Sequence, residues 1–166
     1  NSEYALSKLV SENNIRQHYN SNKQTNFSIL RFGIIYGNRL SNFSAVESLF
    51  INVRKNKIIE VGSLQTARKF IHVADICEGI FASSKIKGCN IINLQGKKLI
   101  SLGNVINISK KIVGNEIKIK ERDPKNKNIR IISNYKSKKL LNWTPKISLY
   151  KGLLMFNKYL DENKFY

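Results

Sequence analysis

The sequence predicts an α/β fold. Helix-like and strand-like segments alternate along most of its 166 residues, and this alternation is typical of layered α/β proteins. Hydrophobic residues make up 42% of the chain and aromatic residues 10%, which is enough to build the core of a globular domain. No internal repeat or low-complexity block interrupts the alternation.

The first two elements are a helix and a strand. Residues 3–19 carry apolar side chains at roughly helical spacing, and the polar residues 20–22 end the segment. The apolar positions of this helix are Leu6, Leu9, Val10 and Ile15. Residues 27–36 are a nearly continuous apolar run with β-branched and aromatic side chains, ended by residues 37–38. Such a run predicts a strand buried on both faces of a parallel sheet.

Later segments continue the alternation. Helices are predicted at residues 45–55, 75–84, 101–113, 133–141 and 148–163, and strands at residues 58–61, 69–73, 90–94 and 117–120. We expect Ser101 to cap the helix that follows it. Pro145 separates the last two helices, because proline lacks an N–H and clashes inside a helix. Trp143, just before it, is expected to be a buried anchor.

The formal net charge of +18 would attract nucleic acid, anionic membranes or phosphorylated metabolites. Lysines are nevertheless scattered through every segment, as background basicity in a chain rich in Lys, Asn and Ile. The densest stretch, residues 118–139, lacks the interleaved aromatics and the recognition helix of nucleic-acid-binding modules. We therefore expect neither a nucleic-acid nor a membrane partner. A basic nucleic-acid-binding module is the less favoured alternative.

Other features bound the class of protein. No apolar run approaches the roughly 20 residues that cross a bilayer, and residues 1–3 do not resemble a signal peptide. Cys77 and Cys89 have no CxxC pair or histidine cluster near them, which indicates neither a disulfide scaffold nor a metal site. His72 is expected to be packed and His18 to lie on the surface. We expect a soluble, cytoplasmic protein.

Tyr4 and Lys8 are the first candidates for chemistry. On a helix, a separation of four residues places the phenol and the ammonium on one face. A free tyrosine keeps its proton well above neutral pH, but an adjacent lysine cation favours the phenolate. The phenol then becomes a usable general acid or base. The spacing alone is a weak signal, because it occurs by chance on many helices.

Five motifs in order make the signal specific. YALSK (residues 4–8) matches a YxxxK motif, and LRFGIIYGNR (30–39) is similar to LRxxNVYGPR. ARKFIHVAD (67–75) is similar to RDFIHVDD, NIINLQG (90–96) to YNVGSG, and KKLLNWTPK (138–146) to the LGWxP signature. Through these motifs the chain resembles the extended short-chain dehydrogenase/reductase family, specifically its NAD-dependent epimerases and dehydratases of nucleotide sugars.

The resemblance implies roles for the catalytic pair and the cofactor. Tyr4 would be the acid/base, and Lys8 would hold the nicotinamide ribose hydroxyls while stabilising the phenolate. Gly33 would lie where the strand backbone touches the nicotinamide end of the cofactor. The cofactor implied is NAD, with NADP left open. The family cradles the pyrophosphate in a glycine-rich turn, which the glycines of this chain do not form.

The resemblance also implies a substrate site. Arg68 corresponds to an arginine that contacts the diphosphate of a nucleotide-diphosphate sugar, a role that suits a forked, permanently charged donor. Arg122 is the candidate for a second such arginine, with Arg130 competing for the role. Four departures from the family motifs concern the substrate. Ile34 replaces an asparagine and Asn38 replaces a proline, while Lys69 and Ala74 each replace an aspartate.

The implied fold is the C-terminal part of a Rossmann-type parallel sheet plus a small mixed α/β substrate-binding domain. Residues 1–39 and 69–95 would complete the NAD-binding domain, and residues 40–68 and 96–166 would form the substrate-binding domain. We expect the chain to be the C-terminal half of an enzyme and to be inactive by itself. Whether the intact enzyme is a homodimer is left open. The expected reaction is hydride transfer at a sugar carbon. A keto-sugar reductase, a decarboxylase and an inactive remnant are the alternatives.

Overall fold

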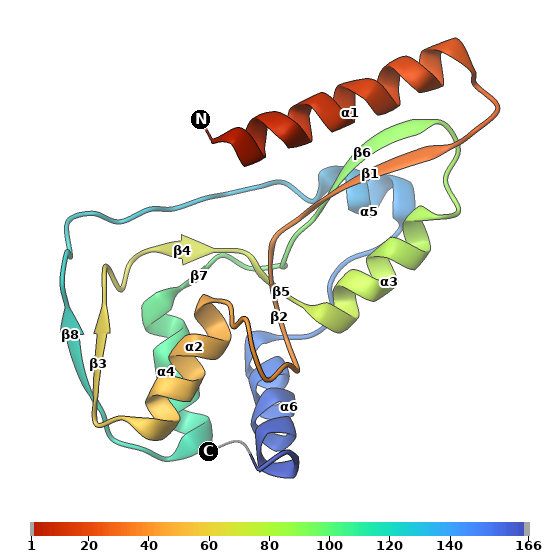
Figure 1. The fold of residues 1–166 in the computed structure, drawn as a ribbon. Helices are drawn as coiled ribbons and strands as arrows, with labels where there is room; N and C mark the ends of the chain where they lie inside the picture. The colour runs from red at the N-terminus through yellow and green to blue at the C-terminus, as the bar shows by residue number, and fades with distance from the viewer. Residues whose placement is uncertain (1, 165–166) are drawn as a thin grey trace.

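The computed structural model describes residues 2–164 and confirms the α/β class (Figure 1). The helices are α1 (Glu3–Ser21), α2 (Ala45–Lys55), α3 (Val73–Ser83), α4 (Leu102–Val113), α5 (Tyr135–Leu141) and α6 (Leu149–Glu162). The strands are β1 (Phe27–Phe32), β2 (Ile34–Tyr36), β3 (Ile58–Val61), β4 (Ala67–Arg68), β5 (Phe70–His72), β6 (Cys89–Leu94), β7 (Ile100–Ser101) and β8 (Lys118–Glu121). The short strands β4 and β7 were not predicted. No helix within residues 2–164 is both long and apolar enough to cross a membrane.

Parallel pairing dominates the strands. β1 runs parallel to β6, with Phe27 opposite Cys89 and Phe32 opposite Leu94. β2 is parallel to β5, and β3 is parallel to β8. The pair β4–β7 is antiparallel, so parallel and antiparallel pairing both occur.

The prediction of one doubly buried strand over residues 27–36 is wrong. The run breaks at Gly33, so that β1 pairs with β6 while β2 pairs with β5. Most of the β1 side chains remain partly or fully exposed, and Phe32 is 44% exposed. The physical reason is that burial depends on the elements packed on the two faces of a strand, and these leave the end of β1, at Arg31 and Phe32, exposed. The apolar sequence of the strand is therefore not matched by burial on both faces.

The buried apolar side chains form two hydrophobic cores. The larger one is formed mainly by α2, α4 and α6, which lie together in Figure 1, and includes the fully buried Phe50 and Phe156. The smaller one joins β5, α3 and β6 through Ile71, Ile76 and Ile92. Trp143 packs in the smaller core and is 5% exposed, which confirms it as a buried anchor.

The division into two domains stays a prediction. Tyr36 and Phe70, assigned to the NAD-binding part, pack in the larger core, and Trp143, assigned to the substrate-binding part, packs in the smaller one. The two cores are thus joined by side chains that cross the predicted boundaries. Residues 1 and 165–166 of the division lie outside the described residues.

Helix α1 forms as predicted, but its apolar residues are not buried. Leu6 is 63% exposed and Leu9 58% exposed, and α1 has no buried residue. Ile15 follows Leu6 by about two and a half helical turns, so these side chains lie on opposite sides of the helix and do not form one stripe. The helix lies along β1 (Figure 1), with which it makes its main contacts.

Candidate functional site

Tyr4 and Lys8 lie together near the start of α1. The helix begins after Ser2, whose hydroxyl accepts a hydrogen bond from the Ala5 N–H at 3.2 Å, a typical N-cap. The Lys8 Nζ lies 5.3 Å from the centroid of the Tyr4 ring. Tyr4 is 72% exposed. The structure therefore brings the predicted pair within reach of each other and leaves the phenol open to a ligand.

The pair lines a cavity of about 600 Å³ between α1 and β1, which we call the helix-side cavity. Its opposite wall is the backbone and side chains of β1, ending at Phe32 and Gly33. Glu12 and Ile15 continue the wall formed by α1. The phenol of Tyr4 and the ammonium of Lys8 thus share one hollow with the end of a parallel strand.

An ion pair spans this cavity and ties α1 to β1. The Arg31 guanidinium donates to both carboxylate oxygens of Glu12, at 2.8 and 2.6 Å. These hydrogen bonds lower the pKa of the Glu12 carboxyl and raise the pKa of Arg31. Because such forked contacts fix orientation as well as distance, the pair sets how α1 lies against the strand.

Gly33 occupies a position with no room for a side chain. Its N–H donates to the Leu94 carbonyl at 2.9 Å. A Cβ atom there would lie 2.7 Å from Gln95 Oε1 and 2.9 Å from the Lys69 carbonyl oxygen, closer than real Cβ contacts allow. A side chain is therefore excluded at this position, and the half-buried Gly33 lines the helix-side cavity and a second cavity as well.

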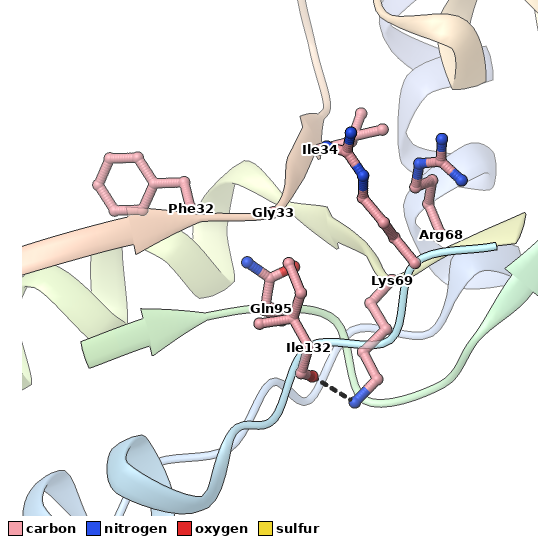
Figure 2. A pocket seen from close by; sticks show the side chains of 8 residues that line it. Phe32, Gly33, Ile34, Arg68, Lys69, Gln95 and Ile132 are labelled. Carbon is pink, nitrogen blue, oxygen red and sulfur yellow. Dashed lines mark hydrogen bonds between the residues drawn. The ribbon is translucent and has the colours of Figure 1, made fainter. Parts of the chain in front are cut away.

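The second cavity, of about 150 Å³, is strongly cationic, and we call it the arginine cavity. Arg68, Lys69 and Arg130 line it, and no carboxylate does within the described part of the chain. Figure 2 shows the residues around it, with Phe32 and Gly33 at the side shared with the helix-side cavity. A cavity with two arginines and a lysine among its lining residues has the positive charge that suits a phosphate or diphosphate group.

Arg68 is held by the segment opposite it. Its Nη1 donates to the carbonyl oxygens of Ala67 and Asn128, and its Nη2 donates to Asn128 Oδ1 at 3.0 Å. These contacts anchor one side of the guanidinium at the edge of the arginine cavity. The predicted diphosphate role of Arg68 thus has a cavity beside it, although the contacts themselves are structural.

Arg122 lies elsewhere. It forms an ion pair with Glu60, joining the end of β8 to β3, and this contact lowers the pKa of Glu60. Arg122 lines neither of the two cavities, whereas Arg130, its competitor for the second arginine, lines the arginine cavity. The structure does not bring Arg122 to Arg68.

Gln95 and Lys69 were not predicted as site residues. Gln95 is only 3% exposed and lines the arginine cavity. A polar residue directly after the apolar strand β6 could have indicated it, because ligand sites of parallel sheets gather at the carboxyl ends of strands. Lys69 follows Arg68 and replaces an aspartate of the family motif. This reversal of charge could have indicated that Lys69 belongs to the site.

Comparisons with known proteins agree on one family. Residues 1–93 match the model of the NAD dependent epimerase/dehydratase family. A UDP-glucuronate 4-epimerase from Thermodesulfobacterium geofontis is 31% identical over 140 residues, which cover 82% of this chain and 43% of that protein. The chain therefore spans less than half the length of this relative.

Solved structures share the fold at low sequence identity. A UDP-glucose 4-epimerase from Thermotoga maritima, solved with UDP-glucose, superposes with a TM-score of 0.81 at 18% identity, covering 97% of this chain and 54% of that one. RMD from Pseudomonas aeruginosa, solved with NADPH, gives a TM-score of 0.84 at 17% identity, covering 98% and 57%. A UDP-glucuronic acid 4-epimerase from Bacillus cereus, solved with UDP-glucuronic acid and NAD, gives 0.74 at 23% identity, covering 89% and 49%.

These likenesses extend over nearly the whole of this chain and about half of each solved chain. The Rossmann-type arrangement implied by the motifs is thereby confirmed. Together with the family match over more than half of the sequence, they show that the chain belongs to the NAD-dependent epimerase/dehydratase family.

Proposed function

We propose that this chain is the part of an NAD-dependent nucleotide-sugar epimerase or dehydratase that carries the acid/base pair and the site for the substrate diphosphate. One observation carries the proposal: the helix-side cavity, with Tyr4 and Lys8, and the arginine cavity, with Arg68 and Arg130, meet at Phe32 and Gly33. A nucleotide sugar lying across this junction would place its diphosphate among the cations and its sugar beside the phenol.

The residues of this chain have distinct roles in the proposal. Tyr4 takes the proton from a sugar hydroxyl and returns it to the keto sugar, while Lys8 stabilises the phenolate and holds the nicotinamide ribose. Bound NAD would supply the acceptor and donor of hydride at the same carbon. Gly33 would touch the nicotinamide end of the cofactor through its backbone, where it lines the helix-side cavity; the space on its Cβ side is filled by Gln95 and Lys69.

The remaining cofactor contacts are assigned to the part of the relatives that this chain does not span. The chain contains no glycine-rich fingerprint for the pyrophosphate. NAD is proposed in preference to NADP from the family description and from the NAD in the Bacillus cereus structure. A nucleotide-diphosphate sugar is the proposed substrate class, and a homodimer stays a prediction.

Substrate binding tests the arginine cavity. We expect UDP-glucuronate to bind the chain, and Arg68→Ala or Arg130→Ala to weaken binding about tenfold each, because each removes a charge-assisted contact to the diphosphate. Isothermal titration calorimetry at fixed salt would measure this. Arg122→Ala removes the same charge outside the cavity and should leave the affinity within about twofold. Equal losses for all three variants would contradict the proposal.

Turnover tests the pair on α1. Fused after the NAD-binding half of the Thermodesulfobacterium geofontis relative, the chain should support epimerisation or dehydration of a UDP-sugar. Tyr4→Phe should lower kcat at least about 100-fold, since it removes the general acid/base, while bound NAD, followed by fluorescence, stays unchanged. Tyr19→Phe, on the same helix, is the matched control. Retention of activity by Tyr4→Phe would overturn the catalytic role.

A further inference from the structure

Residues 128–134, which we call the strap, connect the region after β8 to α5 and carry Arg130 past the arginine cavity. Figure 1 shows this connection running as an extended segment toward α5. Two of its three isoleucines are exposed, Ile129 by 48% and Ile131 by 74%, and Ile132 is half-buried. Little apolar burial therefore fixes the strap, and its position depends on hydrogen bonds.

The first end of the strap is bonded to β4. The Ala67 N–H donates to the Asn128 carbonyl at 3.1 Å, and the Arg130 N–H donates to the Ala67 carbonyl at 3.3 Å. Ala67 and Ile129 thereby form an isolated parallel bridge. This pairing places Arg130 beside Arg68. The hydrogen bond from the Arg130 N–H to the Ala67 carbonyl is long, however, and therefore weak.

The other end of the strap is bonded to β6 and the turn after it. The Asn93 side chain donates to the Ser133 carbonyl at 3.2 Å, and the Asn134 side chain donates to the Gln95 carbonyl at 2.8 Å. Between these two ends lies Ile132, whose side chain contributes to the wall of the arginine cavity.

Lys69 holds the strap between its two ends. Its Nζ donates to the Ile132 carbonyl oxygen at 2.8 Å. Figure 2 shows the Lys69 side chain directed toward Ile132, whereas the Arg68 guanidinium points in another direction. Lys69 is half-buried, where a charge-assisted hydrogen bond is stronger than on an open surface.

The hydrogen bond from Lys69 to the strap also opposes electrostatic repulsion at the arginine cavity. Arg68, Lys69 and Arg130 line one small cavity without a carboxylate among its described lining residues, so their charges repel one another and favour movement of the exposed strap away from β4. The Lys69 ammonium is the one of the three whose contact with the strap lies beyond Arg130, at Ile132. An aspartate, the residue of the family motif, could not donate this bond.

We infer that Lys69 is a positioning residue that fastens the strap and so keeps Arg130 at the arginine cavity for the substrate diphosphate. The ligand side of this inference rests on the proposed function. The fastening itself does not, because it concerns a contact present without ligand. Lys69 acts through Arg130 and is not assigned a contact with the substrate.

Amide hydrogen exchange measured by NMR on the ligand-free chain tests the fastening. Lys69→Met keeps the length of the side chain and removes the donor, so exchange at the Arg130 N–H should accelerate at least about tenfold. The Arg122 N–H, bonded to the Val61 carbonyl at 2.8 Å, should be unchanged. Lys69→Arg retains a donor and should restore most of the protection. Lys118→Met, which removes one exposed lysine elsewhere, is the matched control. Unchanged exchange at Arg130 in Lys69→Met would overturn the inference.

Titration with UDP tests the consequence for the substrate site. Lys69→Met should weaken UDP binding about three- to tenfold, and combining it with Arg130→Ala should add little, because Lys69 acts through Arg130. Additive losses would instead make Lys69 an independent phosphate ligand and would contradict the positioning role. If UDP binds the wild type and Lys69→Met equally well, the inference fails while the proposed function stands. If UDP does not bind the wild type, the proposed function fails, and the exchange measurement still decides the fastening.

Discussion

His72 is buried at the start of α3, and its surroundings favour the neutral ring. Its exposed fraction is 2%, and its Nδ1 accepts a hydrogen bond from the Ala74 N–H at 3.2 Å. Desolvation lowers the pKa of His72, and the charges of Asp75 and Glu47 act in the opposite direction without cancelling it. Accepting the bond requires a neutral ring, so the cap and the burial both favour neutral histidine. The expectation of a packed histidine is confirmed.

This lowered pKa predicts how stability depends on pH. The unfolded chain binds a proton at His72 near pH 6.5, but the folded chain does so only at lower pH. The unfolded state therefore binds more protons in that window, and the free energy of unfolding falls as pH decreases below about 6.5. His72→Asn, which can still cap α3, should flatten this slope in urea titrations at pH 5 to 7.5. His18→Asn changes an exposed ring and should keep the slope of the wild type. A wild-type slope in His72→Asn would contradict the explanation.

Helix α6 depends on a glycine that its sequence alone would disfavour. Gly152 is buried in the helix, and a Cβ there would lie 2.4 Å from the Tyr36 hydroxyl oxygen and 2.7 Å from a carbon of its ring. Tyr36 is 1% exposed and donates to the Ser148 carbonyl at 3.4 Å. Glycine inside a helix is unfavourable relative to alanine by about 1 kcal/mol, and the close approach of Tyr36 explains its presence.

The contact between α6 and β2 predicts opposite effects for two glycine substitutions. Gly152→Ala should destabilise the chain by about 1–3 kcal/mol, because neither the helix nor the buried Tyr36 can move aside freely. Gly103→Ala, in α4, meets its nearest neighbour at 3.4 Å and should be neutral or stabilising by up to about 1 kcal/mol. Thermal and urea unfolding followed by circular dichroism measures both. Stabilisation by Gly152→Ala would contradict the close packing of Tyr36 against Gly152.

Over the whole molecule, positive charge is spread widely, whereas the arginine cavity is local. The chain has 29 lysines and arginines against 11 acidic residues, and it includes exposed lysines on β8 and α5, outside the arginine cavity. Such a field attracts polyanions without a defined site, and salt screens it. The proposed recognition of a diphosphate by the arginine cavity would depend instead on a few fixed donors.

This difference separates the proposed enzyme from a nucleic-acid-binding module. We expect any binding to duplex DNA to lose affinity steeply between 50 and 200 mM salt, as nonspecific binding does, and to change less than about twofold in Arg68→Ala. UDP-glucuronate binding should fall about tenfold in the same variant. Fluorescence anisotropy and calorimetry on the same preparations give the two affinities. Tight, salt-resistant DNA binding that depends on Arg68 would favour the alternative function.

The order and type of the longer elements, and the proximity of Tyr4 to Lys8, were predictable from the amino-acid sequence. Each of these depends on residues a few positions apart: a four-residue separation on a helix, apolar periodicity, or a cap such as Ser101, whose hydroxyl accepts from the Asn104 N–H. The family motifs added a predicted substrate role for Arg68 and a predicted cofactor contact at Gly33.

Only the tertiary structure decided which distant residues meet. It divided residues 27–36 between two partner strands, left the apolar residues of α1 exposed, placed Arg130 rather than Arg122 at the arginine cavity, and joined Lys69 to Ile132 across 63 positions of the chain. Local preferences do not fix such contacts, because strand pairing and the path of an exposed connection depend on how whole elements pack.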